Sequence, residues 1–166
     1  MSLPRSTILA EPAWRPSPKA KVLWAVENAI GVVVLFVGLA VWVFFDDSHR
    51  GWQAVAGLAV AALGALTVVV VPLWRYAVHR WEVTDEAVFT RVGWLDQESR
   101  VAPISRVQTV DTERGPLERL LGLATVTVTT ASSAGAVKIS ALDLAIAEET
   151  VSRLTAIAAQ HRGDAT

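Results

Sequence analysis

The sequence predicts an α+β protein in which two N-terminal transmembrane helices precede a small antiparallel β-sandwich or barrel, which a C-terminal helix caps. Charged residues make up only 19% of the 166 residues and hydrophobic residues 52%, with a mean hydropathy of +0.41. A soluble chain carries roughly 25% charged residues, so the apolar excess requires a place in lipid. The excess of apolar residues lies ahead of Arg75. The residues after Arg75 form short segments in which apolar and polar residues alternate, followed by an apolar repeat with the spacing of a helix.

Two long apolar blocks predict membrane spans at residues 22–45 and 51–74. The second block contains no charged residue and measures roughly 36 Å as a helix, against about 30 Å of bilayer hydrocarbon. The first block spans the bilayer if Glu27 lies among the head groups. One alternative, two buried helices of a soluble core, is disfavoured because the uncharged runs are too long for a small core. The other, a cleaved signal peptide, lacks a small-residue cleavage site after the block.

The flanking positive charges predict the orientation of the hairpin, because cytoplasmic flanks are enriched in Lys and Arg. Before the first span lie Arg5, Arg15, Lys19 and Lys21; the loop holds Arg50; after the second span come Arg75, Arg80 and Arg91. This distribution predicts a two-span protein with both termini in the cytoplasm. The side chains expected to anchor the spans at the membrane interfaces are Trp24, Trp42, Trp52, Trp74, Arg75 and Arg80.

The chain divides into three predicted parts. Residues 1–21 are rich in proline and are expected to form a flexible cytoplasmic tail. Residues 22–74 form the transmembrane hairpin, and residues 75–162 form the folded domain. Small residues that would allow close packing of the helices recur at Gly57, Ala61 and Gly64 on the second span and at Gly31 and Gly38 on the first.

Short strand-like segments follow Arg75. Trp81–Thr84 and Ala87–Val92 flank an acidic turn and predict a hairpin. Ala124–Thr130, which reads ATVTVTT, is the clearest alternation, whereas the register of Ile104–Asp111 is ambiguous.

A helix closes the chain. Asp143 is the expected N-cap, and the apolar side chains that recur on one face are Ala147, Val151, Leu154 and Ala158. Short strands followed by one amphipathic helix predict a small curved sheet covered by that helix.

Several blocks of this domain, in this order, carry a family resemblance. They are WEVTD at Trp81–Asp85, PISRVQTV at Pro103–Val110 and GPLERLLGLATVTV at Gly115–Val128. Together they resemble the YdbS-like bacterial pleckstrin-homology domain family, over roughly residues 75–160. The resemblance implies a pleckstrin-homology-like fold: a strongly bent antiparallel sandwich capped by a C-terminal helix. It also implies a bacterial plasma-membrane protein, since two spans ahead of the domain are typical of the family.

The residue types needed for catalysis or metal binding do not come together in the sequence. There is no cysteine, and His49, His79 and His161 lie far apart. Neither a nucleophile elbow nor a phosphate-cradling loop is present. We therefore expect a non-enzyme with no cofactor and no metal. The net charge of −1 also argues against nucleic-acid binding.

Three functions remain open at this stage. The leading one is a membrane-anchored interaction or scaffold module; the resemblance implies a multispanning partner with related domains and, by analogy, a role in envelope integrity or stress. The alternatives are an accessory subunit of a transporter or exporter, and a membrane-lipid sensor. Phosphoinositide binding is not expected, because the first hairpin loop is acidic. The expected contact surface is Arg106, Gln108, Arg114 and Arg119, and homo-oligomerisation is compatible with all three functions.

Overall fold

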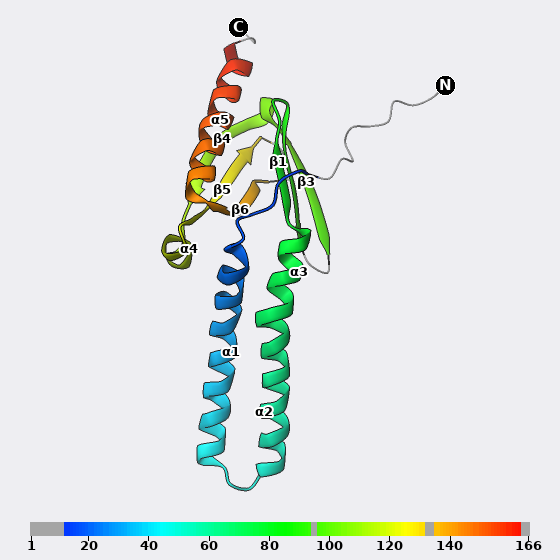
Figure 1. The fold of residues 1–166 in the computed structure, drawn as a ribbon, viewed down its shortest axis with the longest axis vertical. Helices are drawn as coiled ribbons and strands as arrows, with labels where there is room; N and C mark the ends of the chain where they lie inside the picture. The colour runs from blue at the N-terminus through cyan, green and yellow to red at the C-terminus, as the bar shows by residue number, and fades with distance from the viewer. Residues whose placement is uncertain (1–11, 94–95, 132–134, 164–166) are drawn as a thin grey trace, which may run out of the picture.

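In the computed structural model, two long helices lie side by side as a stalk, and a β-rich domain stands at one end of it (Figure 1). The structure describes residues 12–93, 96–131 and 135–163. The first stalk helix is α1, Ala20–Phe45; the second is continuous through α2, Arg50–Ala65, a π-helical turn η2, Leu66–Val70, and α3, Val71–Val78. Both are long and apolar enough to cross a membrane.

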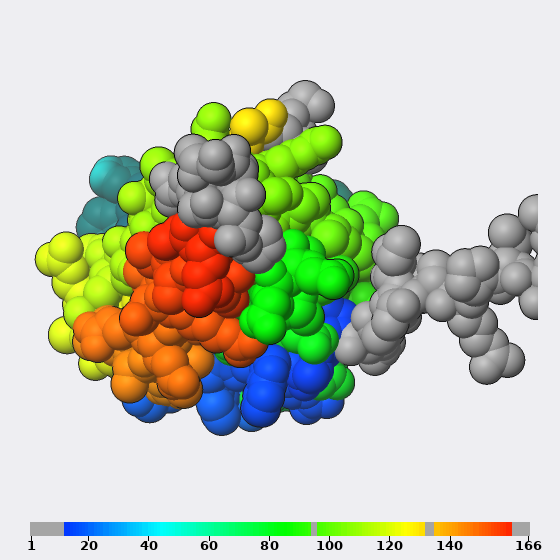
Figure 2. Space-filling view, turned by 90° about the horizontal axis from the view of Figure 1, so that it is seen from above, coloured from blue at the N-terminus to red at the C-terminus, as the bar shows by residue number. Residues whose placement is uncertain are grey.

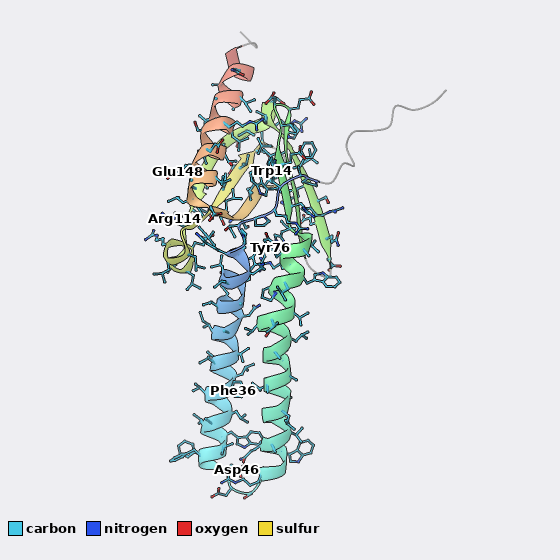
Figure 3. The ribbon with its side chains drawn as sticks, viewed as in Figure 1. Trp14, Phe36, Asp46, Tyr76, Arg114 and Glu148 are labelled. Carbon is cyan, nitrogen blue, oxygen red and sulfur yellow. The ribbon has the colours of Figure 1, made fainter. Side chains whose placement is uncertain are left out.

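The stalk helices expose their apolar side chains along most of their length. Val34 is 65% exposed and Leu58 73% exposed, and Figure 3 shows side chains projecting from both stalk helices along their length. A core helix of a soluble protein would bury these groups. The expected transmembrane hairpin is therefore confirmed, and the soluble-core alternative does not fit. The second helix continues to Val78, so the predicted domain boundary at residue 75 falls inside a helix.

Two of the three glycines of the second stalk helix allow close contact with α1, and those of α1 do not face the partner helix. A Cβ atom added at Gly64 would lie 2.9 Å from Cγ1 of Val32, and one at Gly57 would lie 3.5 Å from Cδ2 of Leu39. Gly31 and Gly38 would meet no atom within 4 Å, and Ala61 is exposed. The interface within the hairpin therefore uses Gly57 and Gly64 but not Ala61, Gly31 or Gly38.

A polar contact crosses the hairpin at the π-helical turn. The N–H of Val71 bonds to the carbonyl of Leu66, one residue further back than in an α-helix. The carbonyl of Thr67 thereby loses Val71 as a donor, and Pro72, the next residue, has no N–H to offer. The side-chain amide of Asn28 on α1 donates to this carbonyl at 2.7 Å. Asn28 thus satisfies a backbone acceptor that would otherwise stand unpaired in hydrocarbon.

The domain consists of two three-stranded antiparallel sheets and α5. The first sheet has the order β1, Arg80–Val83; β2, Ala87–Gly93; β3, Gln97–Pro103. The second has the order β4, Val107–Glu113; β5, Leu123–Thr130; β6, Val137–Asp143. All paired strands are antiparallel. This arrangement confirms the predicted α+β sandwich.

The core lies between the two sheets and α5, Leu144–Gly163. Val88 from the first sheet, Val126 from the second and Leu154 from the helix are fully buried in one cluster. The view from above shows α5 lying beside the β1–β2 hairpin (Figure 2). The predicted apolar face of the helix is confirmed, since Ala147, Leu154 and Ala158 belong to this core and Val151 packs against it.

Local structure adds detail to the sequence expectations at two places. The ambiguous segment Ile104–Asp111 divides into a 3₁₀ turn, Ile104–Arg106, and the start of β4. Asp143 ends β6 and directly precedes Leu144, the first residue of α5, which is the expected N-cap position; its carboxylate forms an ion pair with Lys19 at 3.3 Å. The short helix α4, Pro116–Leu121, ends as expected at Gly122, whose positive φ of 69° suits glycine.

The N-terminal segment is not a free tail over the residues that the structure describes. Trp14 and Trp81 exchange two backbone hydrogen bonds, of 3.0 and 2.8 Å, so the segment extends the β1 edge. Three residues later, the N–H of Ser17 bonds to the carbonyl of Ala141 in β6 at 3.0 Å. The prediction of a flexible tail is wrong for residues 13–19, because these long-range backbone pairs hold the segment on both sheets. Residues 1–11 lie outside the described residues.

Candidate functional site

A groove of about 230 Å³ lies between the N-terminal segment, β1 and α5. Its apolar wall comes from two tryptophans and from Val83 and Ile146, and its polar positions come from one face of α5. The lining residues are Trp14, Trp81, Val83, Ile146, Glu149, Thr150 and Arg153. Tryptophan and arginine are the residue types most enriched at the energetic centres of protein interfaces.

The Trp14 side of the groove is held by hydrogen bonds from three directions. Besides its backbone pair with Trp81, the segment receives a bond from Nε1 of Trp81 to the carbonyl of Arg15 at 3.2 Å. The N–H of Ala13 donates to a carboxylate oxygen of Glu82 at 3.2 Å. Trp14 nevertheless stays 63% exposed. The backbone that carries this large apolar ring is thus held in place, while the ring itself lies mostly at the surface.

The α5 side of the groove offers a mixed surface. Ile146 is 42% exposed, and Glu149 and Arg153 follow it along the exposed side of the helix. Arg153 forms an ion pair at 3.3 Å with Asp85 in the β1–β2 turn, which closes one end of the groove. An apolar depression with charges of both signs at its rim suits an apolar side chain of a partner polypeptide flanked by polar groups.

The arginine-rich surface expected from the sequence does not form one compact site. Gln108 is the extra residue of a β-bulge, exposed near Arg106 at the start of β4. Arg119 is exposed on α4, beyond the other end of that strand, and a strand of this length measures about 20 Å. Arg114 is half-buried, and its Nε donates to the carbonyl of Leu123 at 3.0 Å. Arg114 therefore has a structural contact of its own.

One of the predicted interface anchors lies at the junction of stalk and domain instead. Trp24 is only 3% exposed; the Arg75 guanidinium lies 4.4 Å from its ring centre, and the ring of His79 lies 5.0 Å away. Nδ1 of His79 donates to the carbonyl of Arg75 at 2.8 Å. Burial lowers the pKa of His79 to about 4, so the imidazole is neutral at pH 7. This cluster fixes the domain on the stalk.

The other predicted anchors lie nearer the surface. Trp74 and Trp52 are exposed on the second stalk helix, and Arg80 is half-buried on β1. Trp42 is partly exposed near the far end of α1, where its Nε1 donates to Asp46 at 3.1 Å. These positions agree with side chains that face the bilayer or its surface.

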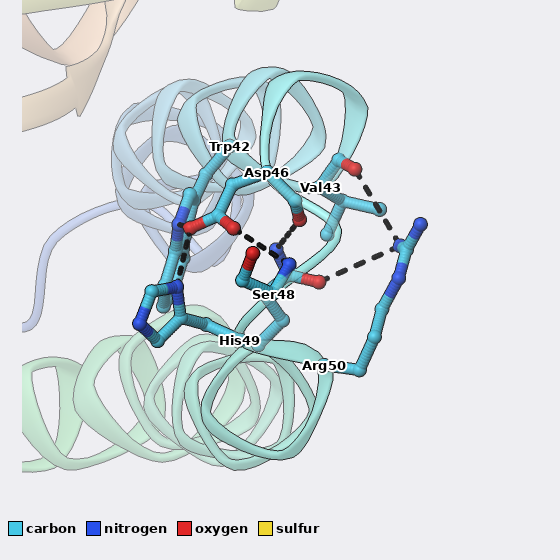
Figure 4. Close-up of polar contacts among 7 residues, drawn as sticks. Trp42, Val43, Asp46, Ser48, His49 and Arg50 are labelled. Carbon is cyan, nitrogen blue, oxygen red and sulfur yellow. Dashed lines mark hydrogen bonds and ion pairs between the residues drawn. The ribbon is translucent and has the colours of Figure 1, made fainter.

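The loop between the spans satisfies its own polar groups (Figure 4). The Asp46 carboxylate accepts bonds from the Ser48 N–H at 2.8 Å and from the His49 ring at 2.7 Å, and these bonds hold its pKa below the usual range. Gln53 donates to the Asp46 carbonyl at 2.6 Å, and Arg50 pairs with Asp47. Among the described residues, no cluster of three or more His, Cys, Asp or Glu side chains could hold a metal ion.

Sequence reasoning missed two of the features that shape these sites. The proline-rich sequence around Trp14 predicts a tail, and no local pattern there indicates a partner 67 positions away (14 to 81). The pairing of Asn28 with the π-helical turn was also missed. The available signals were a polar amide at the start of one apolar block and a proline near the end of the other.

Comparison with known proteins agrees with this architecture. The bacterial PH domain family matches residues 28–157. The chain is 32% identical over 154 residues to the UPF0699 transmembrane protein YdbS of Bacillus subtilis (strain 168), an alignment that covers 89% of this chain and 95% of that protein. No solved structure matches the chain. The chain therefore belongs to the bacterial PH domain family, among the YdbS-like transmembrane proteins.

Proposed function

We propose that this protein is a membrane-anchored, non-catalytic interaction module that works at the cytoplasmic face. The groove beside Trp14 carries the proposal, because it presents a rigidly held, exposed tryptophan next to a mixed helix face. Membership of a family of transmembrane proteins with a PH domain supports a membrane-associated module.

One argument supports the cytoplasmic orientation, and a second supports the placement of both outer ends of the hairpin on the same side of the membrane. The excess of Lys and Arg flanks both outer ends of the hairpin, and only Arg50 lies in the connecting loop. In addition, Trp14 precedes the first span and pairs with Trp81 after the second. The two segments must share one side of the membrane, which an even number of crossings allows.

The partner that we propose is a multispanning membrane protein with related domains, and the process is envelope integrity or stress. The proposal rests on the resemblance to the YdbS-like family. The groove is the proposed contact, since the β1 edge already pairs with the chain's own segment at Trp81, which obstructs strand addition by a partner there.

Site-specific photocrosslinking in intact cells tests this function. A photoreactive residue replaces Ile146 in the groove of the full-length chain, and a matched one replaces Ser152, which is exposed on the same helix but does not line the groove. We expect a recurrent membrane-protein adduct from position 146 and a much weaker one from 152. Trp14→Ala should reduce the adduct at 146 by at least about fivefold. Equal adducts from both positions, or lipid adducts alone, would contradict the proposal.

A second candidate function, an accessory subunit of a transporter or exporter, is favoured by the glycines of α1. Gly31 and Gly38 face away from the hairpin's own interface, and small residues on a lipid-facing surface permit a further helix to pack closely. Gly31→Leu with Gly38→Leu should then abolish co-purification with a transporter while the hairpin remains folded. Unchanged association would exclude this packing mode.

A further inference from the structure

Two cations converge on one aromatic ring where the stalk meets the domain. The Arg15 guanidinium lies 5.8 Å from the ring centre of Tyr76, and the Lys21 ammonium lies 4.7 Å from it. Arg15 belongs to the N-terminal segment, Lys21 to the first turn of α1 and Tyr76 to α3. Figure 3 shows Tyr76 at the domain end of the two stalk helices, far from Asp46 at their other end.

Neither cation has a carboxylate partner among the described residues, unlike other basic groups nearby. Lys19 pairs with Asp143, and Lys138 pairs with Glu113. Within the described part of the chain, the charged ends of the Arg15 and Lys21 side chains are found in contact with the Tyr76 ring. Two unneutralised cations beside a tyrosine form a binding position for an anion.

An apolar groove begins at this position and runs between the stalk helices. Its volume is about 380 Å³, and Lys21 is its only charged lining residue in the described part of the chain. The apolar residues that line it include Val22 and Ala29 on α1 and Val69, Pro72 and Leu73 on the second helix. Alanine at position 29 leaves room that a larger side chain would fill. Because this groove opens at the level of the hydrocarbon, its natural occupant is an acyl chain.

We propose that this end of the stalk binds one anionic phospholipid. The headgroup phosphate lies against Lys21 and Arg15 beside Tyr76, and one acyl chain occupies the groove, which runs from Lys21 to Ala29 and Val69. A soluble phosphate ester offers the same anion, but only a lipid also fills the groove. The site is separate from the acidic β1–β2 turn, at Asp85 and Glu86, and from the groove at Trp14. It does not depend on any protein partner.

Native mass spectrometry of the purified full-length chain tests the site. The chain is released from membranes or nanodiscs that contain equal amounts of phosphatidylglycerol and phosphatidylethanolamine with identical acyl chains. We expect one retained lipid, with phosphatidylglycerol favoured. Each nearby cation contributes several-fold to the binding of an anionic lipid, so Arg15→Gln with Lys21→Gln should lower phosphatidylglycerol retention by about tenfold or more. The matched control, Arg106→Gln with Lys138→Gln, removes the same charges elsewhere and should change it less than about twofold.

A second variant tests the acyl chain independently of charge. Ala29→Phe fills the groove and should reduce retention of both lipids without altering the headgroup preference. Glycerophosphoglycerol, the water-soluble headgroup, should fail to displace the lipid at millimolar concentration. Equal retention of the two lipids, unchanged retention in the double charge variant, or displacement by the soluble headgroup would each overturn the proposal. Since the chain is purified alone, these results are independent of whether the proposed protein partner exists.

Discussion

Asn28 and Thr67 join the two spanning helices through a single hydrogen bond of 2.7 Å from a side-chain amide to a backbone carbonyl. The carbonyl is available because Val71 bonds one residue further back and Pro72 lacks an N–H. A helix irregularity on one span is therefore complemented by a polar residue on the other. In hydrocarbon, where water cannot supply a donor, such complementation fixes the register of the hairpin.

Replacing Asn28 by leucine should destabilise the hairpin by about 1 kcal/mol, in line with interhelical hydrogen bonds in membranes. Reversible unfolding in mixed micelles measures the change. The same substitution in a Pro72→Ala background should cost less, because the restored N–H can bond within the helix. Additive costs in this double-mutant cycle would contradict the complementation.

Gly64→Ala should destabilise the hairpin by about 1–3 kcal/mol, because the new methyl group overpacks the contact with Val32. The matched control is Gly38→Ala, where the methyl group enters open space; alanine also favours helix more than glycine does. In mixed micelles, the free energy of unfolding should therefore be lower for Gly64→Ala than for Gly38→Ala. A similar loss in both would mean that Gly38 also packs closely.

The stability of the junction should decrease as the pH falls from about 6.5 toward 4. Burial depresses the pKa of His79 to about 4 in the folded protein, with the Arg75 charge adding to this effect. The unfolded chain, with an ordinary histidine pKa near 6.5, therefore binds more protons in this window, and acidification favours unfolding. Denaturant titrations between pH 4 and 7.5 measure the slope. His79→Gln should flatten it; an unchanged slope would assign the pH dependence to other groups.

Removing residues 1–18 should lower the melting temperature of the domain by several degrees, because the chain loses its backbone bonds to Trp81 and Ala141. Removal of residues 1–11 is the control, since it keeps every contact of the segment that the structure describes, beginning at Ala13. Thermal unfolding followed by tryptophan fluorescence reports both. Equal melting temperatures for the two truncations would show that the segment adds no stability.

The features predictable from the sequence were those with a local signal. The uncharged runs predict the two spans, the alternation in ATVTVTT predicts β5, and Gly122 predicts the end of α4. Trp24 illustrates the limit: its place near the end of an apolar block suggests a lipid-facing ring, yet Arg75 and His79 approach from another helix and the ring is buried. The same holds for Trp14, whose partner is distant in the sequence. Such contacts depend on how elements pack, and no periodicity within one element reveals them.

The pairing of Trp14 with Trp81, together with the bond from Ser17 to Ala141, also constrains biogenesis. The segment that completes the domain leaves the ribosome before both spans, whereas its acceptor in β6 is synthesised after them. During translation the segment must therefore remain unpaired, on the side of the membrane where the later strands will emerge. The domain can therefore close only after both spans have crossed the bilayer. In a chain with only one span across the bilayer, the N-terminal segment and the strands would lie on opposite sides of the membrane.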